Sequence, residues 1–254
     1  TYNEAARKIQ DQNFNFEFSG YVNYRIIKGR FVIQPGFRTQ GYFSQSVVSP
    51  EPRLGIKYNA TEKLRLKFSG GRYSQNFTSA SSDKDIVNLF NGLLSAPTNV
   101  QDTFVTENYN KVPMKNGLQY AWHAILGLEY DINKRNSLNI EGYYKFFNQL
   151  SNINQNKLYE DLAQFATIDD EFKKDFIIES GKTIGVDVLY KYNNDRIFLW
   201  GVYSLSYSTR WDGFVAYFPV FDRRHNVNLV GSYQFGAKKD LELNVRWNLG
   251  SGLP

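Results

Sequence analysis

The sequence predicts an all-β protein, a transmembrane antiparallel β-barrel, on two observations. First, residues 14–26 (FNFEFSGYVNYRI) place apolar side chains and Gly20 on one parity, and mostly polar ones on the other. Successive side chains of a strand point to opposite faces, and thirteen tilted residues cover roughly 30 Å, the thickness of a bilayer's hydrocarbon core. Second, this pattern recurs along the chain, with tight turns alternating with long connections, as in bacterial outer-membrane barrels.

The alternation predicts about ten strands in five hairpins. Each hairpin consists of two strands joined by a tight turn. In chain order, the predicted strands are 14–26 and 31–43 (turn 28–30), 53–58 and 64–71 (turn 59–63), 120–132 and 138–146 (turn 133–136), 184–192 and 197–207 (turn 193–196), and 227–235 and 241–249 (turn 236–240). Pro35 is the one blemish within the second strand, because proline is tolerated best at an edge or a bulge.

The connections between hairpins all fall on one side and are predicted at 44–52, 74–117, 148–180 and 209–224. A short helix is expected within 82–94, capped by Ser82 or Asp83, and another around 158–166. The two longest connections are expected to be functional loops. Barrels of this kind place short turns in the periplasm and long loops outside the cell.

Composition excludes several classes. No window approaches 18 consecutive apolar residues, so a membrane helix is excluded. The absence of cysteine rules out disulfides, thiolate metal sites and a cysteine nucleophile. A net charge of +5 is spread along the chain without a basic run, so nucleic acid is not expected as a partner. A soluble β-sandwich would also alternate, but with shorter strands.

The two faces carry different residues. Aromatic side chains at the strand ends of the apolar face predict two interfacial girdles, one near the short turns (Tyr24, Phe31, Tyr58, Tyr130, Tyr192 and Phe235) and one near the long loops (Phe14, Phe43, Tyr120, Phe146 and Tyr207). The other parity is predicted to face the lumen and includes Arg25, Arg38, Lys57, Arg65, Lys67, Glu129, Glu141, Lys145, Asp187, Lys191, Glu242 and Arg246. Ten strands closed on themselves would crowd these charges in a narrow lumen, whereas a wider barrel would expose them to water or to a plug.

Three segments, 33–97 (IQPGFRTQGYF to LLSAP), 128–159 (LEYDINKRNSL to QNKLY) and 210–254 (RWDGFVAYFPV to GSGLP), resemble the barrel region of TonB-dependent outer-membrane receptors of the Bacteroidetes type. The resemblance implies that residues 1–254 form a C-terminal portion of a 22-stranded barrel, with the plug domain and remaining strands outside this chain. It implies active import of a scarce or large ligand across the outer membrane, coupled to TonB in the periplasm. Membrane lipid is the other expected partner, with a surface lipoprotein or larger envelope complex as further candidates.

By the same resemblance, Arg72, Tyr73, Gln75, Arg210 and Trp211 are candidate ligand contacts near the extracellular mouth. No cofactor or metal site is predicted. The acidic loop residues could bind a divalent cation but are expected to be solvated instead, namely Asp83, Asp85, Asp169, Asp170 and Glu171.

Three alternative functions stay open. A passive channel and a structural barrel subunit of an envelope complex would have the same strand pattern. The third is an outer-membrane protease of the omptin kind, which would need Asp212, Asp222 and His225 to converge at the rim. The wider sequence shows no likeness to that family, and a non-enzyme is expected.

Overall fold

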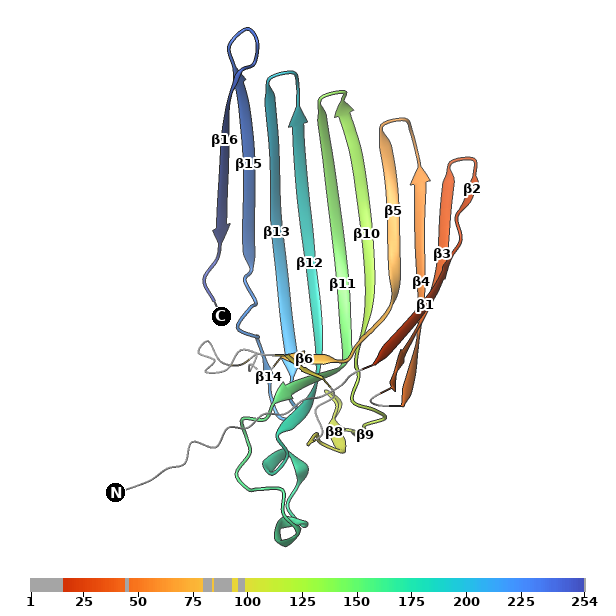
Figure 1. The fold of residues 1–254 in the computed structure, drawn as a ribbon, viewed down its shortest axis with the longest axis vertical. Helices are drawn as coiled ribbons and strands as arrows, with labels where there is room; N and C mark the ends of the chain where they lie inside the picture. Colours follow the sequence, from red (N-terminus) through yellow and green to blue (C-terminus); the bar gives the residue numbers. More distant parts are fainter. Residues whose placement is uncertain (1–15, 44–45, 80–83, 85–92, 96–98, 254) are drawn as a thin grey trace, which may run out of the picture.

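The computed structural model describes residues 16–43, 46–79, 84, 93–95 and 99–253, with the backbone alone at 77–79 and 93–95. Strands running side by side form one antiparallel sheet (Figure 1). Within these residues, no helix has the length and apolar character needed to cross a membrane. Nine of the ten predicted strands and the five predicted turns are confirmed, whereas the first predicted strand is present in two pieces and its residues 14 and 15 lie outside the described residues.

The main sheet has one spatial order, β1-β3-β4-β5-β10-β11-β12-β13-β15-β16, with β2 and β14 added beside β3 and β13. Its strands are β1 (Glu17–Asn23), β2 (Ile26–Lys28), β3 (Phe31–Tyr42), β4 (Val47–Asn59), β5 (Leu64–Gln75), β10 (Gln119–Asn133), β11 (Asn136–Ile153), β12 (Phe176–Asn193), β13 (Ile197–Trp211), β14 (Ala216–Tyr217), β15 (His225–Phe235) and β16 (Leu241–Gly250).

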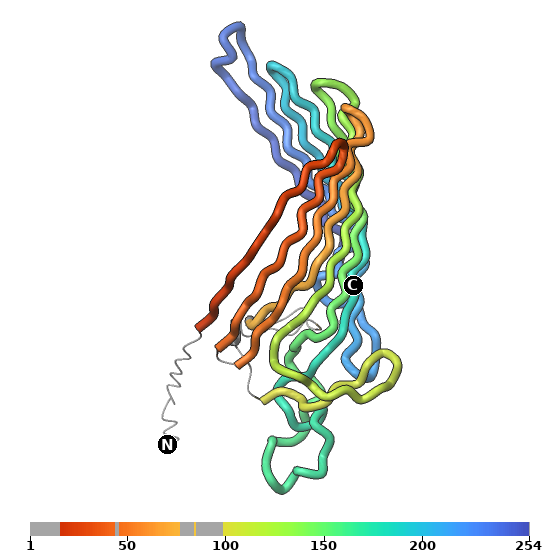
Figure 2. Tube along the Cα trace, turned by 90° about the vertical axis from the view of Figure 1, so that its right-hand side faces the viewer, coloured from red at the N-terminus to blue at the C-terminus, as the bar shows by residue number. Residues whose placement is uncertain are grey.

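The sheet is curved and open. Seen from the side, its strands form a trough rather than a closed tube (Figure 2). Among the described residues, β1 and β16 form its two edges, each with a paired strand on one side only. The narrow ten-stranded closed barrel that the sequence left open is therefore not the arrangement of this chain.

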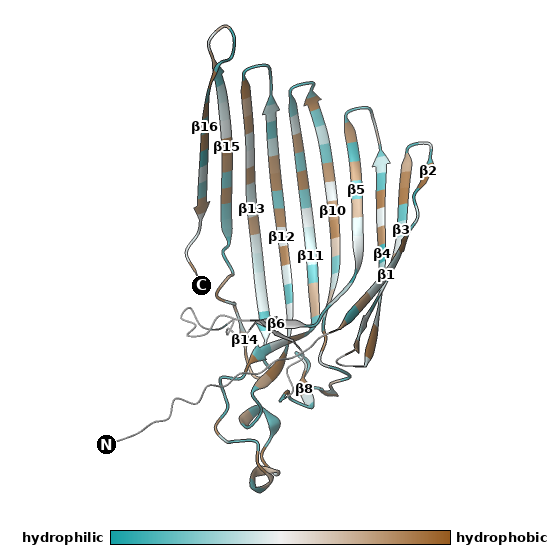
Figure 3. Cartoon of the chain, in the orientation of Figure 1, coloured by the Kyte–Doolittle hydropathy of each residue, from teal (hydrophilic) through white to brown (hydrophobic). Residues whose placement is uncertain are grey.

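Hydropathy alternates along almost every strand of the sheet (Figure 3). The apolar parity is the exposed one at mid-height, where Leu126 of β10 is 67% exposed and Ile184 of β12 is 58% exposed. Water would not favour so broad a band of exposed aliphatic side chains, whereas a hydrocarbon environment would. This is the pattern of a barrel wall that has lipid on its outer face.

The first predicted strand is interrupted. β1 ends at Asn23 and β2 begins at Ile26, because the residue opposite Tyr24 is Pro35. Tyr24 N donates to the Pro35 carbonyl at 3.0 Å, but proline has no N–H to return the bond. Pro35 thus interrupts the strand paired with its own, not the strand that contains it.

The predicted connection at 44–52 is wrong, because β4 already begins at Val47 and pairs with β3 as far as Tyr42. Pro50 and Pro52 do not prevent this pairing. The backbone groups of both prolines face β5 rather than β3. On that side, the Pro50 carbonyl accepts a bond from Arg72 Nη1 at 3.4 Å. Neither proline removes a bond between β3 and β4.

The connection predicted at 148–180 is also shorter than expected, because β11 runs to Ile153 and β12 begins at Phe176. The helix predicted around 158–166 is wrong. That segment contains only one 3₁₀ turn, Ala163–Phe165 (η2), whose N-cap residue Leu162 makes no side-chain capping bond. A second 3₁₀ turn spans Asp170–Phe172 (η3).

The helix predicted at 82–94 falls largely outside the described residues. Its last two residues belong instead to β7 (Leu93–Ser95), which pairs with β6 (Phe77–Ser79). The same long connection contains a second small hairpin, β8 (Thr103–Val105) with β9 (Lys111–Pro113). Trp211 Nε1 donates to the Val105 carbonyl at 2.9 Å, and this bond ties the second hairpin to β13.

The buried core lies where the long connections pack against the loop ends of the strands. Its apolar members include Tyr42, Leu118, Leu150, Ile177 and Ile178. Many polar side chains are buried beside them, including Asn76, Gln101 and Asn152. The loop end is therefore organised by hydrogen bonds as much as by apolar contact.

Gly185 provides a test of the packing within the wall. The ring of Tyr143, the residue directly opposite, lies across it, and a Cβ there would come within 2.7 Å of the Leu205 carbonyl oxygen. We expect Gly185→Ala to destabilise the complete protein by about 1–3 kcal/mol, since added atoms force the neighbours apart. Urea unfolding in phospholipid vesicles measures this.

Gly142 on the neighbouring strand is the matched control, because a Cβ there meets nothing within 4 Å. Gly142→Ala is expected to leave the unfolding midpoint within experimental error. Equal midpoints for the two variants would show that the close approach of Tyr143 to Gly185 is not present in the folded protein.

Candidate functional site

The pairing register gathers the charged parity on one face of the trough. Glu141 lies directly opposite Asp187, Lys57 opposite Lys67, and Arg65 opposite Glu129. Directly paired residues share a face, and the remaining members of the set predicted to face the lumen keep the same parity on their strands, except Arg25, which lies in the break between β1 and β2. Lumen exposure itself stays a prediction, because this chain alone does not enclose a lumen.

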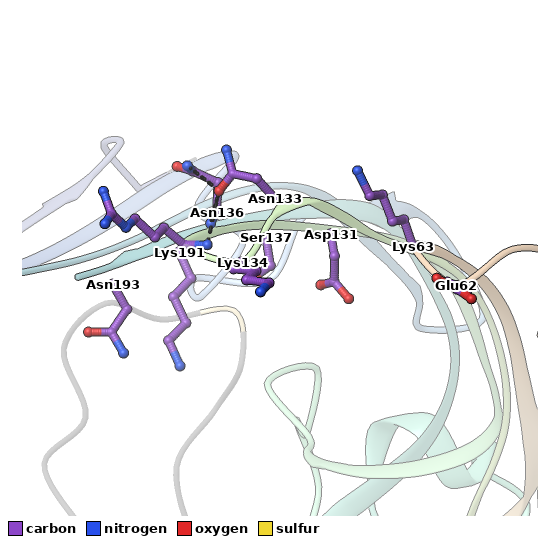
Figure 4. Close-up of a pocket in the computed structure, with 10 residues that line it drawn as sticks. Glu62, Lys63, Asp131, Asn133, Lys134, Asn136, Ser137, Lys191 and Asn193 are labelled. Atoms are coloured by element: carbon purple, nitrogen blue, oxygen red, sulfur yellow. Dashed lines mark hydrogen bonds between the residues drawn. The ribbon is translucent and has the colours of Figure 1, made fainter. Parts of the chain in front are cut away.

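At the turn end, this face carries a network of opposite charges. Arg65 Nη2 lies 2.8 Å from Glu129 and 2.7 Å from Asp131, while Lys67 also pairs with Glu129. A pocket of about 600 Å³ opens beside the network. Asp131, Lys191 and Asn193 point from the arched strands into the open space beneath them (Figure 4). The concave wall is thus polar down to the short turns.

Near the loop end, the concave wall holds a buried carboxylate that the sequence analysis missed. Glu51 is only 1% exposed, and one of its oxygens accepts bonds from Ser74 N at 2.9 Å and Ser74 Oγ at 2.7 Å. Its other oxygen lies 2.7 Å from Arg53 and 3.8 Å from Arg38. Glu51 has the parity of Lys57, so strand alternation would have found it had the segment not been predicted as a loop.

A stack of flat side chains crosses the same wall. The Arg53 guanidinium lies 4.6 Å from the centre of the Tyr73 ring, and the Tyr73 and His123 rings are 4.5 Å apart. Within the described residues, Arg53 Nε and His123 Nε2 are buried without a hydrogen-bond partner. A wall that presents a cationic and aromatic stack is suited to a polar or planar ligand.

A second buried carboxylate, Glu179 of β12, lies at the loop end of the wall and is 0% exposed. It accepts bonds from the Tyr217 hydroxyl at 2.7 Å and from Asn152 Nδ2 at 3.0 Å, and Arg210 Nη1 lies 3.4 Å away. The cluster ties together β11, β12, β13 and the returning strand β14. The cluster therefore positions the loop end of the wall. Like Glu51, Glu179 lies in a segment that the sequence analysis predicted as a loop.

Asp212, the first residue after β13, fixes the turn that leads into β14. One carboxylate oxygen accepts the backbone N–H groups of Phe214 and Val215, both at 2.8 Å, and the other pairs with Lys84. Burial alone would raise the pKa of Asp212, but the Lys84 ammonium and the two N–H groups outweigh burial and hold it below its ordinary value.

The lowered pKa predicts a pH dependence. A carboxyl group whose pKa is depressed on folding stabilises the fold fully above its unfolded pKa, and the stabilisation is lost as pH falls through the folded value. We expect the Phe214 and Val215 amides to lose hydrogen-exchange protection only below the ordinary aspartate pKa of about 3.9. In Asp212→Asn, which keeps an acceptor oxygen but no charge, this pH dependence should vanish. If protection of the two amides depended on pH in Asp212→Asn as it does in the unaltered protein, Asp212 would not be the group responsible.

The five predicted ligand contacts divide between the two faces. Tyr73, Gln75 and Arg210 have the parity of the charged, concave face. Arg72 and Trp211 lie on the apolar face, where Arg72 pairs in register with Trp122 and Trp211 is buried beside the hairpin β8-β9. Only three of the five can therefore contribute to the inner wall.

The three residues that a protease would need have separate partners. Asp212 pairs with Lys84, and the Asp222 carboxylate accepts bonds from Ser208 N and Arg224 Nε, both at 2.8 Å. His225 Nδ1 lies 2.8 Å from the Tyr203 hydroxyl. This arrangement gives no support to an acid–base pair at the rim.

Among the acidic residues at 169–171, the Asp170 carboxylate has partners of its own. Asp170 accepts the Asp102 N–H at 3.0 Å and pairs with Lys173 at 3.3 Å. Burial, and then the neighbouring Asp169, raise the pKa of Glu171. In the part of the chain that the structure describes, no three carboxylate or histidine groups gather to hold a metal ion. Asp83 and Asp85 lie outside the described residues.

No protein-family model and no curated protein matches this sequence. Solved structures do match its fold. The FrpB iron transporter from Neisseria meningitidis is 10% identical with a TM-score of 0.55, and the match covers 91% of this chain and 32% of that one. The alcaligin outer-membrane receptor FauA from Bordetella pertussis is 13% identical with a TM-score of 0.57, covering 93% and 37%.

A third match is FpvAI, solved in complex with pyocin S2, at 12% identity and a TM-score of 0.57, covering 90% of this chain and 28% of that one. The chain thus spans about a third of the length of the solved structures it matches. These matches do not bear on the Bacteroidetes type, which stays a prediction. They show that the chain has the fold of part of an outer-membrane β-barrel.

Proposed function

We propose that this chain is part of the barrel of a TonB-dependent outer-membrane transporter, which imports a scarce or large ligand past a plug domain. The observation that carries the proposal is the open, curved sheet with an apolar convex face and a charged concave face. Open sheet edges do not occur in hydrocarbon, so further strands must pair with β1 and β16. The closed barrel would then exceed ten strands.

A barrel of that width has a lumen too large for the side chains of its own wall to fill. The charged concave face, which carries partly exposed groups such as Lys67 and Glu129, is suited to contact with water and with a polar plug. The structural likeness to an iron transporter and to a receptor for alcaligin supports a transport role. In this proposal the long connections are extracellular and the short turns periplasmic, where TonB would act.

Liposome swelling of the complete protein separates active from passive transport. We expect vesicles containing it to exclude small sugars such as arabinose, because the plug closes the lumen, and we expect the purified protein to bind the C-terminal domain of TonB. Rapid swelling without TonB binding would establish the passive channel instead. A surface lipoprotein or an envelope complex would be recognised as a stoichiometric partner in the same purification.

A further inference from the structure

The structure contains a groove on the apolar, convex face of the wall, away from the proposed transport path. It has a volume of about 730 Å³. Its floor is made by outward side chains of β4, β5, β10 and β11, and its outer rim by the connection that carries β8 and β9. The floor and rim include Val48, Arg72, Trp122, Phe146, Phe104 and Lys115.

The small hairpin β8-β9 is held on this face by contacts at its turn. Glu107 pairs with Lys182 at 3.1 Å, and Lys182 shares the outward parity of Ile184 on β12. Trp211, also on the outward parity, bonds to Val105 and packs edge-on against Tyr109. The hairpin therefore forms a fixed outer wall for the groove.

The groove combines apolar surface with two available cations. The Arg72 guanidinium stacks 4.4 Å from the centre of the Tyr120 ring, and its one hydrogen bond within the described residues is the long contact to the Pro50 carbonyl. Lys115 is exposed, and none of the ion pairs among the described residues includes it. The acidic Glu107 in the rim is already neutralised by Lys182.

The depth of the groove identifies its occupant. Tyr120 and Phe146 belong to the aromatic set at the loop ends of the strands, which marks the boundary between hydrocarbon and headgroups. An occupant at this depth meets the apolar floor with acyl chains and the two cations with phosphate. Arginine presents several donors to phosphate, and basic pockets at this level recognise phosphorylated headgroups.

We propose that this groove binds a phosphorylated lipid of the surrounding leaflet. With the long loops outside the cell, as in the proposed function, that lipid is lipid A. Its phosphates contact Arg72 and Lys115, and its acyl chains lie against Val48, Trp122 and Phe146. The proposal goes beyond transport and rests on the proposed orientation alone.

Native mass spectrometry of the complete protein, released from phosphatidylcholine nanodiscs that contain lipid A, tests the proposal. We expect one tightly retained lipid A, and a retention at least about tenfold weaker in the double variant Arg72→Gln, Lys115→Gln, because charged hydrogen bonds are lost. The control double variant Lys28→Gln, Lys238→Gln removes two exposed cations at the turn end and should retain lipid A as the unaltered protein does.

Three further measurements make the result decisive. Lipid A without its phosphates should be retained equally weakly by the unaltered protein and by the double variant Arg72→Gln, Lys115→Gln. Inorganic phosphate should not displace lipid A from the unaltered protein. Retention of phosphatidylglycerol in place of lipid A would overturn both the assignment and the orientation, leaving transport untouched. Equal retention by all variants, each shown to be folded by its heat-dependent gel mobility, would overturn the groove as a lipid site.

Discussion

Leu126→Arg is expected to destabilise the membrane-embedded protein by about 2–4 kcal/mol, the cost of an arginine on the lipid face of a barrel near mid-height. Leu126 points outward from the middle of β10, between Phe68 and Gly142 on the neighbouring strands. An arginine there must leave water for hydrocarbon or distort the bilayer around it. The change is measured as a shift in the urea midpoint in phospholipid vesicles, read by heat-dependent gel mobility.

Ser69→Arg is the matched control for this prediction. Ser69 is exposed, lies next to Phe68 on β5, and has the parity of the concave face. The same charge at the same height should change the midpoint little, by about 0.5 kcal/mol or less, as for surface substitutions generally. If Leu126→Arg were as mild as Ser69→Arg, the convex face would be facing water, as in a soluble β-sandwich.

Glu179→Leu is expected to cost about 3–5 kcal/mol, since it removes the carboxylate of a buried ion pair and leaves the charge of Arg210 in place. The Arg210 side chain is 14% exposed, so little water would compensate it. Tyr217 and Asn152 would also lose their acceptor. Because these residues join β14 to β11 and β12, limited proteolysis should cut the loop end faster in the variant.

Two other variants test whether the cost of Glu179→Leu comes from its buried ion pair, rather than from one hydrogen bond or from the loss of any carboxylate on this face. Tyr217→Phe removes one hydrogen bond to Glu179 and should cost about 1 kcal/mol. Glu242→Leu removes a carboxylate of the same parity that is exposed on the edge strand β16, and should cost about 0.5 kcal/mol or less. Equal effects of Glu179→Leu and Glu242→Leu would refute the role of Glu179 at the loop end.

Alternation predicted the strands well because it is a local property. Along β10, every second side chain from Tyr120 to Ile132 is apolar and most polar side chains lie between them, so both the strand and its two faces can be read from that segment alone. The turns were predictable for the same reason. Asn133 and Asn194 each accept two backbone N–H groups from the residues that follow, an arrangement that short turns favour.

Features that depend on a partner far along the chain were not predictable. The break between β1 and β2 arises from Pro35 across the pair, and it requires the register to be known. The extension of β4 through two prolines depends on which of its sides faces β5. Both features depend on contacts between neighbouring strands, which the alternation within a single segment does not reveal.

The buried carboxylates were missed for a related reason. Glu51 and Glu179 have the same parity as the charged residues further along their own strands, but both lie in segments assigned to loops. The two candidate contacts on the convex face, Arg72 and Trp211, were misplaced because proximity to the mouth was used instead of parity. Carrying the parity of each predicted strand into the adjoining residues would have assigned all four to the correct face.

The central claim is that one face of this sheet meets lipid and the other meets water. Because the chain has no cysteine, single cysteines at residues 124–129 of β10 can each carry a spin label in the membrane-embedded protein. We predict that labels at the even positions are accessible to oxygen and protected from a water-soluble nickel chelate, and that labels at the odd positions show the reverse. Equal access of the chelate to all six positions, or the opposite alternation, would contradict this assignment of the two faces.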